Sequence, residues 1–403
     1  GDVLQRDEDK EEWGLRDWDA DTEAKMDMES YEWIRVDADF EWLCWKEFPS
    51  MASYMYVSQL QQDKDVVAQQ ESMLYLQTVP PHPLVSTFLT RTMMDTRYFH
   101  GIRTMAALAI KTHAGPSTQY IGMKQLEKAY SQFFCYPDST TPKPNDFSDK
   151  RAYKVEMAII KAFSMIRDNH GNCPKKARTM LLDILRFNEN SSNQFSDNFK
   201  ITTLLSALAD CLIPKKDASN VLDMGDDEDD PEPTEYRKAV VDELDRYRRN
   251  DEWIDSYHNS FTVTVLDCKQ RLMKAKVMPL DAMEFAQYLH DGSSEYVRIK
   301  AFSALIELGY LTNNSVACLL LNCASTDPSP YVRRHLFEIF CVGVAAIAFG
   351  QDKKPEPAKA KTNGVAAVNG DHDVVMGGTG AAPGGAEGGD DGLIIEEDAT
   401  RDA

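Results

Sequence analysis

The chain has 403 residues, of which 43% are hydrophobic, and its formal net charge at pH 7 is −21. This length accommodates roughly two or three domains, and the hydrophobic fraction is ordinary for a protein with a folded core. The chain contains no run of 18 or more apolar residues, so the sequence predicts that no part of it spans a membrane.

The negative charge is concentrated in three segments. Residues 1–30 carry a net charge of −8, residues 217–235 carry −9 and residues 351–403 carry −6, which together leave about +2 for the remainder. We expect residues 1–30 to be a disordered acidic lead-in, residues 215–235 a mobile acidic loop, and residues 351–403 a disordered tail rich in Gly, Ala and acid. The near-neutral remainder lacks the strong basic patch that is typical of nucleic-acid-binding domains.

Aromatic and β-branched residues are dense between Tyr31 and Phe48. This composition predicts one or two β-strands, and no later part of the sequence offers an obvious partner strand. Because a lone hairpin is barely stable, we expect these strands to complete a sheet formed by polypeptide upstream of Gly1.

From about Gln59 to residue 350 the apolar residues recur at helical spacing, which predicts a mainly α domain. A break at Asp95 to Arg97 separates two helices, which we expect to form an antiparallel pair. Pro214 is expected to stop a later helix. The predicted helices lie near residues 84–93, 99–110, 150–167, 175–188, 198–212, 235–249, 261–274, 280–290, 295–309, 315–324 and 330–346.

A local pattern recurs within this domain. Val297-Arg298 precedes apolar residues at helical spacing, Val332-Arg333 repeats the pattern 35 residues later, and Ile102-Arg103 is a third copy. The pattern is typical of the second helix of a HEAT-type unit, in which each helix pair must bury one face against the next. Residues 59–350 are therefore predicted to form an irregular HEAT-like α-solenoid.

The arginines of this pattern are expected to pack the repeats together through an ion pair or a helix cap, with ligand contact as the alternative. Asp291 and Asp327 lie just before the helices of Arg298 and Arg333. An arginine fork binds a carboxylate through two hydrogen bonds, so these aspartates are the predicted anionic neighbours.

Motifs of the common enzyme classes are missing from the sequence. It has no His-Glu-x-x-His, no Gly-x-x-x-x-Gly-Lys-Ser/Thr and no Gly-x-Ser-x-Gly, which carry zinc peptidase, phosphate-binding and serine hydrolase chemistry respectively. The 8 cysteines include no Cys-x-x-Cys pair and mostly lie in apolar runs, so we expect buried free thiols. We therefore predict no catalytic residue, no metal, no cofactor and no small-molecule substrate.

Basic residues cluster at the start of one predicted helix and around another. A solvated helix face is the default interpretation, because no aromatic residues are interleaved with the cations, and phosphate contact is the alternative. The weak candidates for phosphate contact are Lys175, Lys176, Arg178, Lys269, Arg271, Lys274 and Lys276.

Several motifs occur in the order in which a known family has them. The clearest are residues 33–40, Trp-Ile-Arg-Val-Asp-Ala-Asp-Phe, and residues 65–72, Asp-Val-Val-Ala-Gln-Gln-Glu-Ser. The further motifs are residues 59–60, 167–175, 195–198, 256–257 with 262–265, and 327–333. On these motifs the chain resembles the C-terminal part of the TFIID subunit 2 family. These TATA-box-binding-protein-associated factors are similar in architecture to zinc aminopeptidases but lack the catalytic site.

The resemblance implies that residues 31–58 end an aminopeptidase-like β-sandwich and that a helical-repeat domain follows. It also implies a non-catalytic scaffold in the nucleus that supports RNA polymerase II preinitiation-complex assembly and core-promoter recognition. The implied partners are the other TFIID subunits, with core-promoter DNA contacted through the whole complex. The alternative is the C-terminal helical domain of an active zinc aminopeptidase whose catalytic domain lies upstream of Gly1.

Overall fold

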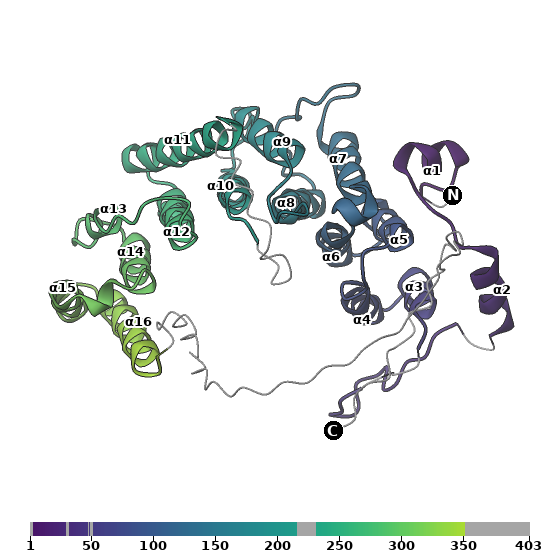
Figure 1. The fold of residues 1–403 in the computed structure, drawn as a ribbon, viewed down its shortest axis with the longest axis horizontal. Coiled ribbons are helices and arrows are strands. Elements are labelled where there is room, and N and C mark those ends of the chain that lie inside the picture. The colour runs from purple at the N-terminus through teal and green to yellow at the C-terminus, as the bar shows by residue number, and fades with distance from the viewer. Residues whose placement is uncertain (1–2, 30–31, 47, 49–50, 216–230, 351–403) are drawn as a thin grey trace, which may run out of the picture. The chain divides into compact units, whose positions relative to one another are not determined.

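The computed structural model describes residues 3–29, 32–46, 48, 51–215 and 231–350 (Figure 1). Within those residues the chain forms α-helices and short 3-10 helices, and no β-strand. The α-helices are α1 (Asp7–Trp13), α2 (Ala20–Met28), α3 (Ser53–Gln62), α4 (Val66–Leu76), α5 (Pro83–Met94), α6 (His100–Ala109), α7 (Ile121–Phe134), α8 (Lys150–Met165), α9 (Lys175–Arg186), α10 (Asn198–Leu212), α11 (Pro231–Trp253), α12 (Ser260–Lys274), α13 (Met283–Ala286), α14 (Glu295–Glu307), α15 (Asn314–Thr326) and α16 (Pro330–Ala348).

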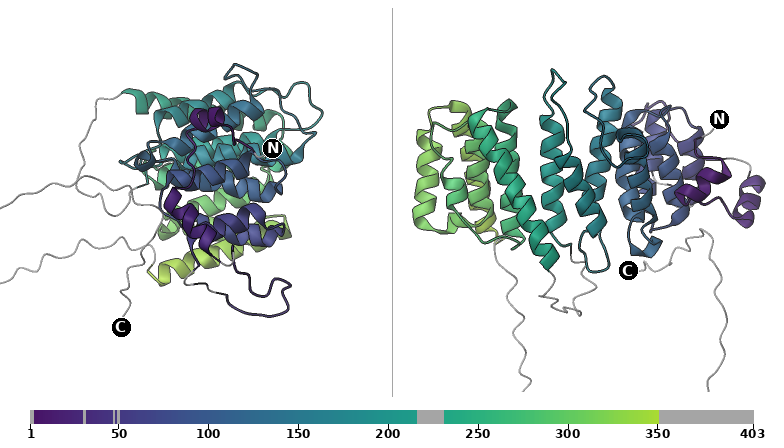
Figure 2. Two further views of the ribbon diagram at one scale, coloured as in Figure 1. Left: turned by 90° about the vertical axis from the view of Figure 1, so that its right-hand side faces the viewer. Right: turned by 90° about the horizontal axis from the view of Figure 1, so that it is seen from above.

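Residues up to Gly343 form one compact unit, and the last turns of α16, from Val344, belong to a second. Within the first unit the helices lie in two rows (Figures 1 and 2). One row consists of α4, α6, α8, α10, α12 and α14, each of which packs on the next. The second row packs against the first, with α3 on α4, α5 on α6, α9 on α8 and α10, α11 on α12, and α13 on α14. Successive helix pairs therefore bury one another's faces, as in an α-solenoid, and the predicted mainly α repeat fold is confirmed.

The rows are held together by apolar side chains three or four residues apart on each helix. In α9, Ala177, Leu181, Ile184 and Leu185 are buried, which is one stripe of an amphipathic helix. Side-chain caps define several helix starts. Asp65, Asp149 and Asn313 accept hydrogen bonds from backbone N–H groups at the starts of α4, α8 and α15, which satisfies donors that a helix leaves unpaired.

The observed helices agree closely with those predicted between residues 84 and 346, with three differences. Helix α11 begins at Pro231, ahead of the predicted start near residue 235, because proline fits the first turn of a helix. The predicted helix near residues 280–290 shrinks to the 4 residues of α13, Met283–Ala286. Helix α7 was not predicted individually.

The strands predicted between Tyr31 and Phe48 are wrong for this chain. Residues 32–46 contain no strand, and Asp37 and Phe40 have φ angles of 53° and 57°, which interrupts an extended backbone. The segment is instead anchored by Arg35, whose guanidinium pairs with Asp63 and Asp65 at 3.4 and 2.6 Å. A strand without a partner strand cannot form a ladder, and α3 already begins at Ser53, inside the predicted 31–58 region.

The expectation of a disordered lead-in is also wrong for residues 3–29. They form α1 and α2, and Trp13 and Leu15 are buried. Charge density alone predicts disorder here, but each tryptophan can bury a large apolar area against the helices. Most of the acidic loop, residues 216–230, and the whole tail, residues 351–403, lie outside the described residues.

The cysteines are free thiols, as predicted, but only half of them are buried. Cys135, Cys173, Cys211 and Cys268 are buried, whereas Cys44, Cys318 and Cys341 are exposed. Burial raises the pKa of Cys268 to about 12, so this thiol is protonated at neutral pH and behaves as a small apolar side chain.

Candidate functional site

Arg298 on α14 is the centre of a buried clamp between successive repeats. Its Nε and Nη2 donate to the Asp327 carboxylate over 2.8 and 3.2 Å, and its Nη1 donates to the carbonyls of Asp291 and Ser293. Asp327 follows α15 and also accepts from the N–H of Ser329, at the entrance to α16. The clamp therefore ties α14 to the α15–α16 connection through charge-assisted hydrogen bonds.

The clamp sits beside the core of the C-terminal repeats. Val297 and Val332 are buried in the same apolar cluster, together with Phe302, Leu305 and Leu336. The valine of each Val-Arg pair therefore points into the core. The geometry fits the predicted packing role of Val297, Arg298 and Val332, and it selects Asp327 over Asp291 as the carboxylate partner.

Arg333 does not repeat the clamp. Its Nη1 donates to the carbonyls of Asp327 and Pro328, both in the turn just before its own helix, and the side chain is only partly buried. Arg333 thus braces the α15–α16 turn within one helix pair. The predicted bridge between units is formed by Arg298 alone of these two arginines.

The Ile102-Arg103 pair uses a third arrangement. Ile102 is buried, and so is Arg103, whose Nε donates to the carbonyl of Met93 near the end of α5 over 2.9 Å. The Arg103 guanidinium also lies 5.6 Å from the ring centroid of Phe133 on α7. Burial lowers the pKa of Arg103 from its ordinary value. A guanidinium still keeps its charge, so it acts here as a cap across helices.

Several of the candidates for phosphate contact have carboxylate partners. Lys269 is buried and binds Asp245 and Glu284 over 2.7 and 3.0 Å, so it is not available to phosphate. Arg271 pairs with Asp210 and Asp267. Lys269 and Arg271 therefore act as structural cations that join α12 to its neighbours.

The remaining candidates are more exposed. Lys176 pairs with Glu127 over 2.6 Å, and Lys274 approaches Glu307 at 3.9 Å. The Arg178 guanidinium lies 5.2 Å from the ring centroid of Tyr236. Lys175 and Lys276 are solvent exposed. These contacts favour the solvated-face interpretation over a phosphate site.

A buried lysine that sequence reasoning missed lies at the α8–α10 junction. Lys200 Nζ binds Glu156 over 2.7 Å and Asn145 Oδ1 over 2.8 Å, and Tyr130 donates its hydroxyl to Glu156. Burial and the neighbouring Glu156 raise the pKa of Tyr130 well above its usual value. The sequence holds a signal for it, because Lys200 lies four residues before Leu204 and therefore on the same, apolar face of α10.

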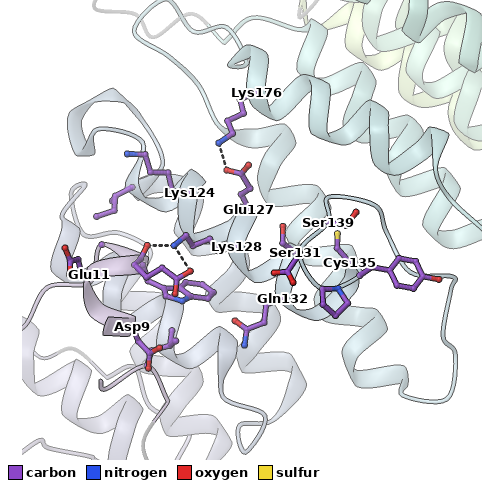
Figure 3. A pocket seen from close by; sticks show the side chains of 18 of the residues that line it. Asp9, Glu11, Lys124, Glu127, Lys128, Ser131, Gln132, Cys135, Ser139 and Lys176 are labelled. Carbon is purple, nitrogen blue, oxygen red and sulfur yellow. Dashed lines mark hydrogen bonds and ion pairs between the residues drawn. The ribbon is translucent and has the colours of Figure 1, made fainter. Parts of the chain in front are cut away.

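A pocket of about 1020 Å³ lies between α1, α7 and the segment after α7 (Figure 3). Two ion pairs join residues that line it, Lys128 with Glu12 at 3.2 Å and Lys176 with Glu127 at 2.6 Å. Cys135 also lines it, but burial raises the pKa of this thiol, so it is a poor nucleophile. The pocket therefore fits contact with another polypeptide better than covalent catalysis.

Neither a metal cluster nor a membrane-spanning helix is found in the part of the chain that the structure describes. No group of three or more His, Cys, Asp or Glu side chains is placed there to hold a metal ion. No helix within that part is long and apolar enough to cross a membrane.

Comparison with known proteins identifies the repeat array. Residues 53–356 match a family described as TAF2-like, TPR repeats. The chain belongs to this TAF2-like family. TPR units, like HEAT units, are stacked helix pairs, so the helix-pair solenoid fits the repeat type in the family's description. All three Val-Arg or Ile-Arg pairs lie inside the matched residues, whereas α1 and α2 lie outside them.

Curated relatives of this TAF2-like chain bear the name Transcription initiation factor TFIID subunit 2. The Schizosaccharomyces pombe protein is 39% identical over 355 residues, which are 88% of this chain and 30% of that protein. The Saccharomyces cerevisiae protein is 32% identical over 252 residues, 61% of this chain and 17% of that protein. The Gallus gallus protein is 27% identical over 328 residues, 79% of this chain and 27% of that protein.

The chain thus spans less than a third of the length of each of these three relatives. Their names are those of a transcription factor subunit, and they give no support to the alternative of an active zinc aminopeptidase.

Proposed function

We propose that this chain is a non-catalytic scaffold segment of the general transcription factor TFIID, acting in RNA polymerase II preinitiation-complex assembly and core-promoter recognition. The observation that carries the proposal is the match of residues 53–356 to the TAF2-like family, joined to 39% identity with the fission-yeast TFIID subunit 2 over 88% of the chain. The proposed partners are the other TFIID subunits, and the proposed location is the nucleus.

The site geometry supports a scaffold role. The buried polar groups of the array are used to fix helices relative to one another, as Arg298 does with Asp327 and Lys269 with Asp245 and Glu284. A buried ion pair holds its two elements in one register at little net gain in stability. A rigid array of this kind suits a surface on which other subunits assemble.

Promoter DNA is proposed to be reached through the whole complex and not by this chain alone. Its cations are scattered and several are paired, and binding through a few phosphate contacts weakens steeply with salt. In a fluorescence-anisotropy titration at physiological salt, we expect the isolated chain to bind promoter and scrambled duplexes equally weakly. Tight binding that depends on sequence would contradict this part of the proposal.

The proposal is tested by recovery of TFIID from fission-yeast nuclear extract on the tagged full chain, with quantitative mass spectrometry. We expect several TFIID subunits to be enriched together. The matched control is Ala301→Pro, which places proline inside α14 at a buried position and should break the helix. Equal recovery on both chains, or recovery on neither, would contradict a role that depends on the folded array. A fluorogenic aminoacyl substrate incubated with the same chain should remain uncleaved.

A further inference from the structure

The acidic N-terminal segment, residues 3–18, packs on α5 and α7. The segment itself precedes the family-matched residues 53–356. Trp13 and Leu15 are 6% and 7% exposed, and the ring centroids of Trp18 and Phe88 are 5.0 Å apart. The stretch from residue 3 to residue 18 thus carries three apolar anchors within six positions, Trp13, Leu15 and Trp18. Tryptophan anchors in pockets dominate the energetics of many interfaces.

The surface beneath these anchors presents a fixed hydrogen-bond donor. Gln125 on α7 is fully buried, and its side-chain oxygen accepts from the hydroxyls of Ser86 and Thr90 on α5. These two bonds orient the amide, so that its Nε2 donates to the carbonyl of Trp13 over 3.4 Å. Thr87 in turn accepts from the backbone N–H of Arg16 over 2.9 Å. The surface therefore binds a peptide backbone as well as side chains.

Charge completes the match. Residues 3–18 contain six acidic and three basic residues. Lys128 on α7 pairs with Glu12 over 3.2 Å, and Arg91 on α5 lies 3.5 Å from Asp17. Five residues of α5 and α7 make these contacts and are named here the acceptor surface: Thr87, Phe88, Arg91, Gln125 and Lys128.

The acceptor surface continues beyond its present occupant. The pocket in Figure 3 extends along α7 past α1, from Lys124 and Lys128 to Ser131 and Gln132. α1 has only 7 residues. The pocket therefore leaves room along α7 beside the present segment, with Lys124 among its lining cations.

We propose that the acceptor surface is a docking groove for an acidic, tryptophan-bearing segment of a partner protein, and that residues 3–18 occupy it in cis as an exchangeable competitor. The inference is drawn from contacts within this chain and does not rest on the proposed function. The rim ion pairs are exposed to solvent and hold the segment only weakly. A tethered segment binds at an effective concentration on the order of millimolar, so seating in cis does not require high affinity.

The experiment makes the cis segment removable without altering its side chains. A site for a sequence-specific protease is inserted after Met28, which is 87% exposed, in the full chain. The probe is a fluorescein-labelled synthetic peptide of residues 3–18, titrated by anisotropy into the uncut chain and into the cut chain after gel filtration. We expect the peptide to bind the cut chain at least about tenfold more tightly than the uncut chain, because the competitor has dissociated.

Two controls assign the binding to the acceptor surface. A peptide with Trp13→Ala and Trp18→Ala should lose at least about tenfold in affinity for the cut chain. The chain variant Arg91→Glu/Lys128→Glu should bind the native peptide weakly and regain binding to a peptide with Glu12→Lys and Asp17→Arg, which separates loss of charge pairing from loss of folding.

Three outcomes would overturn the proposal. In the first, fragment 1–28 stays bound through gel filtration at low micromolar concentration and resists an excess of peptide. In the second, the peptide binds cut and uncut chains equally, or neither of them. In the third, the uncut chain forms dimers that the peptide dissolves, which would make a second copy of this chain the occupant.

Discussion

Two of the arginine–aspartate pairs in the described residues differ sharply in burial. Between α14 and the α15–α16 connection, the side chains of Arg298 and Asp327 are 5% and 6% exposed. At the N-terminal segment, those of Arg91 and Asp17 are 11% and 50% exposed. A buried pair loses hydration and leaves a costly charge if either partner is removed, whereas an exposed pair is solvated either way. The Arg298–Asp327 pair sets how α14 packs against the α15–α16 connection. The Arg91–Asp17 pair adds little to a contact that the N-terminal tryptophans make with α5 and α7.

The largest expected effect is at the buried pair. Arg298→Met should lower the free energy of unfolding by roughly 3–5 kcal/mol, because the Asp327 carboxylate stays buried without its partner. Urea denaturation followed by circular dichroism measures the loss, and hydrogen exchange should place it at residues 293–343, since repeat arrays open locally. The matched control is Arg334→Met, an exposed arginine of α16 with 77% of its side chain accessible. A loss below about 1 kcal/mol for Arg298→Met would remove the contrast between the two regions.

A second buried polar contact of the array should respond to pH. His113 is fully buried in the 3-10 helix η1 (Ile110–His113), and its Nδ1 accepts from the N–H of His82 over 2.9 Å. Burial, with a smaller contribution from His82, lowers the pKa of His113 from 6.5 to about 4.

Because the unfolded chain takes up this proton more readily than the folded chain, stability should fall as the pH drops from about 6.5 to about 4, by on the order of 3 kcal/mol. Above pH 6.5, His113 should contribute nothing to the change of the unfolding free energy with pH. The variant His113→Asn should show a shallower fall over this window in a series of denaturant titrations. His170→Asn, at an exposed position, should behave as the native chain does. Parallel profiles for the native chain and His113→Asn would refute the assignment.

Arg333 should give an intermediate effect. Its hydrogen bonds go to two backbone carbonyls in the preceding turn, so Arg333→Ala leaves no buried charge behind. We expect a loss of about 1–2 kcal/mol, smaller than that of Arg298→Met and confined to the α15–α16 turn. If Arg333→Ala cost as much as Arg298→Met, burial would not be the deciding variable.

The smallest expected effect is at the exposed pair. Asp17→Asn should change the free energy of unfolding by less than about 1 kcal/mol, and the change should shrink further in high salt. Differential scanning fluorimetry at two salt concentrations is sufficient to measure it. A large loss that persists in salt would show that the N-terminal segment depends on this charge and not on its tryptophans.

Much of the array could be predicted from the sequence because helical periodicity is a local property. The boundaries of α5, α8, α10 and α12 follow from apolar spacing and from prolines. The Val-Arg and Ile-Arg pairs mark arginines that bond to backbone or carboxylate groups at helix ends. Which partner each arginine takes depends on how helix pairs stack, and that is a long-range property. Arg298 therefore donates to the Asp327 carboxylate, whereas Arg333, in the same sequence pattern, donates only to backbone carbonyls.

The remaining differences have the same origin. The segment around Trp42 and Trp45 has strand-like composition, yet residues 32–46 form no strand, and the two tryptophans are 74% and 92% exposed. The lead-in has the composition of a disordered segment, yet Trp13 and Leu15 find a surface on α5 and α7. In both cases the outcome depended on whether a distant surface was available, which residue composition does not report. The ion pair of the buried Lys200 cannot be predicted from the apolar face of α10, because its partner Glu156 comes from a different helix.

The most direct test of the scaffold proposal is a replacement in fission yeast. The region of the S. pombe TFIID subunit 2 that aligns with this chain over 355 residues is exchanged for this chain, and the assembled complex is purified through another TFIID subunit and quantified by mass spectrometry. The scaffold account predicts that the chimaera enters the complex at near-normal stoichiometry and that Arg298→Met in the chimaera reduces its incorporation. A chimaera that is expressed and folded but absent from the purified complex would contradict the account.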